Sequence, residues 1–316
     1  MSLIVQGGLG TVDDLSDILR RLETSLGPLS GEPDPLSGGI TNRNFRVTLG
    51  GADYVVRLPG KDTDLLGIDR EAERLATEAA ARLGIAPAVA AALEDCLVTN
   101  FIVCEPVQRR DLLGGVEEVA RALRSFHDSG TRLPTSFRVP DLLGDYAEIV
   151  RRRGGTLPGA YSDAVFAAAR VAAALPVAVA CPCHNDLLAG NIIRVASDAS
   201  IRIVDWEYAG MGDPHFDLGN LSINNDFDEA MNDRLLRAYH GEPPSDRGRA
   251  ALRLMRVLSD AREAAWGVVQ GTVSELDFDF EGYASEHFER LGETVAGPYF
   301  QEWLVLAGGE ESSQTA

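Results

Sequence analysis

The feature that most constrains this 316-residue chain is a polar segment, His-Asn-Asp-Leu-Leu-Ala-Gly-Asn, at residues 184–191. It is followed directly by Ile192-Ile193, and an apolar run at 201–204 leads to Asp205. Both apolar stretches predict short strands on either side of a turn. Asp186, Asn191 and Asp205 are therefore expected to be presented from one bend and one nearby strand end.

This order of residues suits the transfer of a phosphoryl group. Such a reaction needs positioning and countercharge more than covalent help from the protein. Protein kinases carry H-R-D-x-x-x-x-N and then D-F-G, and the His, the first Asp, the gap to Asn and a later Asp all have counterparts here. Mg²⁺ prefers oxygen ligands. The pattern predicts Asp186 as the catalytic base and Asn191 and Asp205 as ligands of Mg²⁺.

Two other interpretations of this region are possible. His-x-Asp can be an ordinary turn, and the segment after it can cap a short helix. Cys181, Cys183 and His184 could bind zinc, but a single residue between the cysteines is tight for a zinc site, and no partner cysteine pair exists elsewhere. The three matches in the right order favour the phosphoryl-transfer interpretation.

The composition narrows the possible partners. A formal net charge of −19 argues against nucleic acid as a partner and is compatible with a small cationic substrate. The four cysteines have no disulfide-framework spacing, which predicts reduced thiols and a cytoplasmic location. The start of the chain lacks a secretory signal pattern, and no apolar stretch is long enough for a bilayer, so no membrane partner is expected.

The spacing of apolar residues along the chain predicts an α+β fold with two unequal lobes. The first third is rich in strand-like segments, with a helix before them and another between them, and the remainder is mainly helical. We expect a nucleotide-binding lobe over 1–101 and a catalytic and acceptor-binding lobe over 102–316. The predicted elements of the first lobe are helices at 12–22 and 68–83 and strands at 44–49, 54–58 and 96–103.

The segment 36–45, Leu-Ser-Gly-Gly-Ile-Thr-Asn-Arg-Asn-Phe, joins two predicted strands and is a candidate phosphate-binding loop. Glycines let backbone N–H groups approach phosphate oxygens, and polar side chains can add donors. An ordinary hairpin turn is the alternative. The residues expected to contact the nucleotide here are Ser37, Gly38, Thr41 and Asn42.

A cation is also needed on the strand that follows. The single lysine, Lys61, lies beyond Pro59-Gly60, so Arg57 at the end of the predicted strand takes this role. Arginine stays protonated and can bind phosphate through two hydrogen bonds. Glu71 and Glu73 on the next helix point to different faces, so only one can orient Arg57. Glu73 is favoured and Glu71 stays open.

Taken together, these motifs resemble the aminoglycoside phosphotransferase and choline kinase superfamily over roughly residues 30–300. Residues 203–210 and 216–220 resemble choline or ethanolamine kinases, and bacterial choline kinases most closely. The resemblance implies a protein-kinase-like fold that uses ATP and Mg²⁺. It also implies that residues 99–102, with Asn100 and Ile102, contact the adenine. Asn100 departs from the acidic residue frequent at that position, and Asn185 stands where other residues also occur.

The acceptor that best fits the sequence is choline. Its methylated ammonium cannot donate hydrogen bonds, so aromatic faces and nearby carboxylates must recognise it. The predicted cage residues are Tyr208, Trp266 and Tyr283, near Trp206, with Asp217 and Asp279 as charge partners. Core packing is the alternative role for each aromatic. Ethanolamine, thiamine or an aminoglycoside are alternative acceptors, and a catalytically silent nucleotide-binding protein is a further alternative.

Overall fold

The structure is a computed structural model that describes residues 12–36, 42–60, 63–112, 114–175 and 178–308. The chain divides into two compact units. The first contains residues 1–106, 190–208 and 274–278, and the second contains the remainder. The segment 190–208 thus belongs to the strand-rich unit. A division of the chain after residue 101, as expected from the sequence, would place this segment in the helical part.

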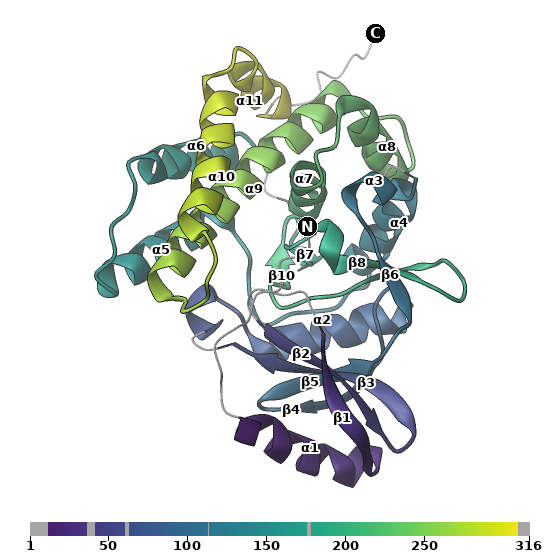
Figure 1. The fold of residues 1–316 in the computed structure, drawn as a ribbon. Coiled ribbons are helices and arrows are strands. Elements are labelled where there is room, and N and C mark those ends of the chain that lie inside the picture. The colour runs from purple at the N-terminus through teal and green to yellow at the C-terminus, as the bar shows by residue number, and fades with distance from the viewer. Residues whose placement is uncertain (1–11, 37–41, 61–62, 113, 176–177, 309–316) are drawn as a thin grey trace. The chain divides into compact units, whose positions relative to one another are not determined.

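The first unit is built on a five-stranded antiparallel sheet in the order β1-β2-β3-β5-β4 (Figure 1). A two-glycine turn joins β2 to β3, and both glycines have positive φ, at Gly50 and Gly51. The elements are α1 (Val12–Leu26), β1 (Leu29–Leu36), β2 (Asn42–Leu49), β3 (Ala52–Pro59), α2 (Arg70–Arg82), β4 (Val89–Leu93) and β5 (Cys96–Asn100).

The two faces of this sheet have different roles because side chains alternate along each strand. Val56 and Leu58 of β3 are buried in a core with Ile18, Leu19 and Leu22 of α1. The residue between the two β3 side chains therefore points to the opposite face. This alternation directs Arg57 away from the apolar core and leaves it available for α2.

A second, three-stranded sheet completes the first unit, in the order β6-β8-β9. It consists of β6 (Cys104–Pro106), β8 (Ile192–Val195) and β9 (Ile201–Ile203). The β8–β9 hairpin is fastened to the α2–β4 connection because Ile203 N donates to Ile85 O at 2.7 Å. The structure thus confirms that the two apolar runs after the polar segment form short strands.

The second unit is mainly helical and is organised around one long helix, α9 (Figure 1). This helix packs against α5, α6, α7, α10 and α11. The elements are α3 (Arg109–Leu112), α4 (Val116–His127), α5 (Val139–Arg152), α6 (Ala160–Ala174), β7 (Cys181–Cys183), β10 (Gly210–Gly212), α7 (Pro214–Asn224), α8 (Glu229–His240), α9 (Asp246–Val273), α10 (Phe280–Ala296) and α11 (Phe300–Gly308).

The α7–α9 contact depends on a glycine. A Cβ atom at Gly219 would lie 2.5 Å from the Met255 Cβ, so only glycine permits this close approach. α7 is thereby held close to α9, and both helices carry the polar residues described below. The α+β fold class is confirmed, with a strand-rich part and a larger helical part.

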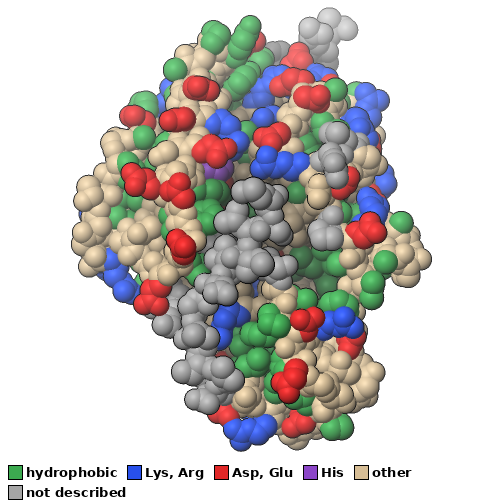
Figure 2. Space-filling view, viewed as in Figure 1, with side chains coloured by type: hydrophobic (Ala, Val, Ile, Leu, Met, Phe, Trp, Pro, Cys, Tyr) green, Lys and Arg blue, Asp and Glu red, His purple; other side chains and the backbone are tan. Residues whose placement is uncertain are grey.

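The surface carries mixed charge on the face shown in Figure 2, where acidic and basic side chains are interspersed. Among the residues that the structure describes, no helix is both long and apolar enough to cross a bilayer.

Candidate active site

The predicted metal ligands lie at one end of the β8–β9 hairpin. Asn191 directly precedes β8 and Asp205 follows β9, and Ile192 pairs with Ile203 across the hairpin. Val204 N donates to Asn191 O at 2.9 Å, so the pairing extends to the residue before Asp205. Antiparallel register therefore brings the two polar residues to the same strand ends.

Asp205 has a strained backbone for a non-glycine residue. Its φ of 67° lies in the left-handed region, and its carboxylate is about a quarter exposed. Such conformations are concentrated at functional sites, where the surrounding structure maintains them. Asn191 and Asp205 offer the oxygen donors that Mg²⁺ prefers, so the donor set fits the ion predicted here.

Arg57 lies among three carboxylates of the first unit. Its Nη1 is 3.2 Å from Glu73 Oε1, its Nη2 is 3.1 Å from Glu207 Oε2, and Nη2 also donates to Asp205 Oδ1. Burial by itself lowers the pKa of Arg57, but the charges of Asp205, Glu73 and Glu207 outweigh it and raise that pKa above its ordinary value. The guanidinium is thus a permanent, oriented positive charge at the metal-ligand end of the hairpin.

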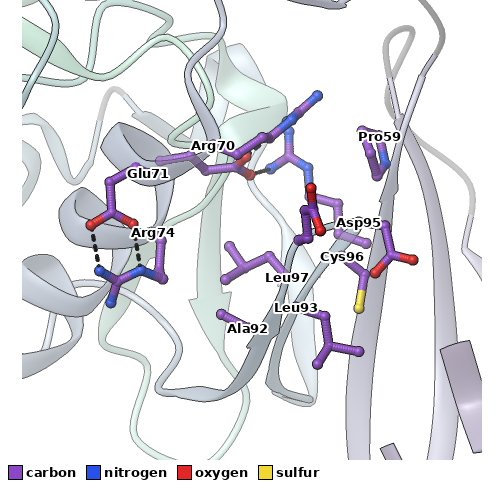
Figure 3. Close-up of a pocket in the computed structure, with 12 residues that line it drawn as sticks. Pro59, Arg70, Glu71, Arg74, Ala92, Leu93, Asp95, Cys96 and Leu97 are labelled. Carbon is purple, nitrogen blue, oxygen red and sulfur yellow. Dashed lines mark hydrogen bonds and ion pairs between the residues drawn. The ribbon is translucent and has the colours of Figure 1, made fainter. Parts of the chain in front are cut away.

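The structure pairs Glu73, and not Glu71, with Arg57. Glu73 is buried in α2 and also accepts from Arg70 Nη1 at 2.8 Å. Glu71 is exposed and accepts two hydrogen bonds from Arg74, at 2.9 and 2.7 Å, which Figure 3 shows as dashed lines. The two glutamates are two residues apart on the helix, which is why they face different surroundings.

A cavity of about 340 Å³ lies beside this cluster, between α2 and the β4–β5 hairpin (Figure 3). Arg57 and Glu73 form part of its lining, together with Arg70 and Arg74 of α2 and the apolar side chain of Leu97. The cavity therefore lies next to Arg57 and its carboxylate partner Glu73, on the side of α2. Asn42, Asn100 and Ile102 are not among its lining residues.

The other predicted nucleotide residues have the following positions. Asn42 begins β2, is buried, and donates from Nδ2 to Glu207 Oε2 at 2.8 Å. Asn100 ends β5 and is exposed, and Ile102 follows it and is partly exposed. Ser37, Gly38 and Thr41 lie outside the residues that the structure describes.

Glu207 is a functional candidate that the sequence analysis missed. It is 2% exposed and contacts both Arg57 and Asn42. Burial and the neighbouring charge of Asp205 raise its pKa, and Arg57 counteracts them. The available signal was its position two residues after Asp205, in the turn that follows β9.

In the second unit, α7 holds the loop that carries Asp186. Asp217 is fully buried and its two oxygens accept from His184 N at 2.8 Å and Asn185 N at 2.7 Å. Burial would raise the pKa of Asp217, but the hydrogen bond and charge of His127 outweigh it and lower that pKa. An ionised Asp217 thus fixes the backbone immediately before Asp186.

Further contacts hold the other side of Asp186. Leu187 N donates to Asn220 Oδ1 at 2.5 Å, and Leu187 O accepts from Asn225 Nδ2 at 3.0 Å. Asn185 has a φ of 68°, in the left-handed region that asparagine tolerates better than most residues. The loop therefore holds Asp186 through its backbone on both sides.

The aromatic candidates divide between the two units. Trp266 and Tyr283 of the second unit pack edge to face with ring centroids 5.6 Å apart. Trp206 and Tyr208 belong to the first unit and are almost fully buried, and Trp206 Nε1 donates to Ile203 O at 3.0 Å. Trp206 thus has the core-packing role named as its alternative.

The two expected charge partners have structural roles. Asp217 supports the loop backbone as described above. Asp279 is exposed and is the N-cap of α10, where its Oδ1 accepts from Gly282 N at 2.8 Å. The carboxylate beside the aromatic pair is instead Glu263, which accepts from Tyr283 OH at 2.7 Å. Sequence reasoning missed Glu263, although it lies three residues before Trp266 on one helix.

The structure brings together a trio of possible zinc ligands that differs from the one considered in the sequence, and it gives little support for zinc. His127, Cys183 and Asp217 lie close together, with candidate ligand atoms within 4.8 Å of one another. Both ring nitrogens of His127 are already engaged, Nδ1 with Tyr239 OH at 2.7 Å and Nε2 with Asp217 at 2.9 Å. Burial also raises the pKa of Cys183, which disfavours the thiolate that a metal requires.

Comparison with known proteins assigns the family. A sequence profile of the phosphotransferase enzyme family matches residues 33–255. A solved choline/ethanolamine kinase family protein from Mesorhizobium loti is 30% identical, with a TM-score of 0.76 over 94% of this chain and 98% of that one. The chain belongs to the phosphotransferase enzyme family, in its choline/ethanolamine kinase group.

Two further relatives agree with this assignment. "Probable choline kinase 1" of Arabidopsis thaliana is 24% identical over 88% of this chain and 92% of its own length. A structure of LicA in complex with AMP is 23% identical and has a TM-score of 0.73 over 92% of this chain and 99% of that one. The predicted family, protein-kinase-like fold and phosphotransferase class are confirmed.

Proposed function

We propose that this phosphotransferase transfers the γ-phosphoryl group of ATP to the hydroxyl group of choline. The observation that carries this proposal is the shared end of the β8–β9 hairpin, where Asp205 follows β9, Asn191 precedes β8 and Arg57 contacts Asp205. Oxygen ligands for a divalent cation and a fixed guanidinium are the elements that bind a nucleotide triphosphate.

The first unit would hold the phosphoryl donor. Asn191 and Asp205 would bind Mg²⁺, which supplies countercharge to the phosphate oxygens. Arg57 would contact the phosphates, with Glu73 limiting its side-chain freedom. The segment with Asn42 at its end would approach the phosphates, and Asn100 and Ile102 the adenine. The AMP in the LicA structure supports an adenine nucleotide as the ligand of this fold.

The second unit would supply the base. Asp186 accepts the proton of the acceptor hydroxyl as its oxygen forms a bond to the γ-phosphorus, and the bond from that phosphorus to the β–γ bridging oxygen breaks. The products are phosphocholine and ADP, and the proton is left on the Asp186 carboxylate. The backbone hydrogen bonds to Asp217 and Asn220 support this role because they hold the base in place.

Choline is favoured by the paired rings of Trp266 and Tyr283, since aromatic faces attract a methylated ammonium that cannot donate hydrogen bonds. The family also includes ethanolamine kinases, and the buried carboxylate of Glu263 beside Tyr283 makes ethanolamine the second candidate. ATP as the donor and four cysteines without a disulfide fit the cytoplasmic location that we propose.

The deciding experiment measures ADP release with purified protein, ATP and Mg²⁺ over choline, ethanolamine, thiamine and an aminoglycoside. We expect the highest kcat/KM with choline, and loss of turnover by at least about 100-fold in Asp186→Asn while ATP still binds. A higher kcat/KM with ethanolamine would overturn the choice of acceptor. ATP binding without ADP release for any alcohol would indicate a catalytically silent protein.

A further inference from the structure

A buried arginine contacts the base in the second unit. Arg262 of α9 has a side chain that is 2% exposed, and its Nη1 donates to Asp186 Oδ1 at 3.2 Å and to Glu263 Oε1 at 2.9 Å. A guanidinium removed from water needs counter-ions, because an uncompensated buried charge is strongly destabilising. The two carboxylates together meet this need, so the base is one half of the counter-charge of Arg262.

Glu263 is itself held by two other helices. Its Oε2 accepts from Tyr283 OH of α10 at 2.7 Å, and its Oε1 lies 3.4 Å from Asn220 Nδ2 of α7. Burial would raise the pKa of Glu263, but the charge of Arg262 outweighs it and holds that pKa below its ordinary value. Glu263 is therefore a fixed negative charge that anchors the guanidinium from one side.

These contacts form a closed circuit around the base. Asn220 accepts from Leu187 N through Oδ1 and contacts Glu263 through Nδ2, while Glu263 holds Arg262 and Arg262 holds Asp186. The backbone next to the base and the carboxylate of the base are thus tied to the same asparagine. A circuit of this kind restricts the rotation of the Asp186 side chain.

We propose that Arg262 is a positioning residue for the catalytic base: it holds the Asp186 carboxylate in one orientation, and Glu263 holds Arg262. The inference rests on the proposed role of Asp186. Orientation matters because a reacting group displaced by about 1 Å can lose about 100-fold in rate. A purely structural role would instead make Arg262 and Glu263 an ion pair that only fills the helix interface.

A double variant separates the two roles. Arg262→Met alone leaves the buried Glu263 carboxylate without its cationic partner. This variant is therefore expected to have a lower melting temperature, and its loss of activity could reflect lost stability alone. Arg262→Met/Glu263→Gln removes both charges and conserves volume, so it is expected to recover the melting temperature. If Arg262 positions the base, the double variant still loses kcat by about 10- to 100-fold while its KM for ATP stays unchanged.

Arg262→Lys provides the conservative variant, since it retains the charge and loses the planar group. It should recover part of the kcat that Arg262→Met loses. A matched control is Arg290→Met/Asp260→Asn, which removes a part-buried pair between α10 and α9, Arg290 Nε to Asp260 Oδ2 at 3.0 Å. This control should leave kcat unchanged. A double Arg262 variant with wild-type kcat would overturn the inference.

Crystal structures of the wild type and of Arg262→Met/Glu263→Gln give a readout that does not depend on turnover. We expect the Asp186 carboxylate to adopt a different rotamer, or several, in the double variant. An unchanged single rotamer would overturn the inference. Inactivity of the wild type with every acceptor would defeat the proposed function, and the two structures would still decide whether Arg262 orients Asp186.

Discussion

Arg57 of β3 and Glu73 of α2 form an ion pair in which Nη1 and Oε1 are 3.2 Å apart. The pair joins a sheet strand to a helix within the first unit and leaves the other guanidinium nitrogen, Nη2, to contact Asp205 and Glu207. The guanidinium that we propose as a phosphate contact is thus oriented by the helix next to it.

Glu73→Gln tests this orientation. Loss of the charge should lower kcat/KM for ATP about tenfold, equivalent to ~1.4 kcal/mol, because Arg57 is then less restrained. Steady-state kinetics with varied ATP measure the effect. Glu71→Gln is the matched control: it removes only an exposed pair with Arg74 and should leave kcat/KM for ATP unchanged. Equal losses in both variants would contradict the assigned role of Glu73.

Asp205→Asn tests the metal ligand. An amide is a weaker ligand than a carboxylate for a hard cation, so the Mg²⁺ concentration needed for half-maximal activity should rise at least about tenfold. Titration of Mg²⁺ at fixed ATP measures this value, and chelation by EDTA should abolish wild-type turnover.

The control for Asp205 comes from the same hairpin. Asp198 lies in the β8–β9 turn, where its Oδ1 accepts from Ser200 N at 3.0 Å. Asp198→Asn should leave the Mg²⁺ dependence unchanged. An unchanged Mg²⁺ dependence in Asp205→Asn as well would remove Asp205 from the metal site.

The pH dependence of stability tests Asp217. Its pKa is lowered in the folded state, so its contribution is fully present above the ordinary carboxyl value of 3.8 and is lost as pH falls through the lower folded value. At pH 7, Asp217→Asn should lower the free energy of unfolding by about 3 kcal/mol. The difference from wild type should shrink below about pH 4.

Urea denaturation at pH 7, 5 and 3 measures this difference. Asp233→Asn is the control, because its carboxylate pairs with Arg249 at the surface and should contribute less than about 1 kcal/mol. A difference for Asp217→Asn that grows as pH falls would show that another group, and not this carboxylate, carries the effect.

Trp266→Leu tests the aromatic pair. Leucine fills part of the space but has no aromatic face, so the KM for choline should rise about tenfold, in line with ~1–2 kcal/mol for a cation on an aromatic ring. The KM for ATP should stay unchanged. Trp303→Leu on α11 is the control and should alter neither constant. A change in the KM for ATP alone would place Trp266 outside the acceptor site.

The sequence by itself determined the family, the fold class and the candidate catalytic residues. Asp186, Asn191 and Asp205 stand at fixed spacings in one continuous segment, and the apolar runs beside them specify the β8–β9 hairpin. Local patterns of this kind are readable because strand alternation and turn length depend on neighbours in the chain.

Only the tertiary structure decided which charges pair. Three contacts show this: Arg57 with Glu73 rather than Glu71, Asp217 with the loop backbone, and Arg262 with Asp186. The partners in these contacts are 16 to 76 positions apart in the sequence. Which buried charged side chains pair depends on the direction in which each helix or strand points its side chains. That direction is set by the packing of the whole unit. For the same reason Asp217, which the sequence suggested as a substrate contact, instead holds the backbone of the loop that carries Asp186.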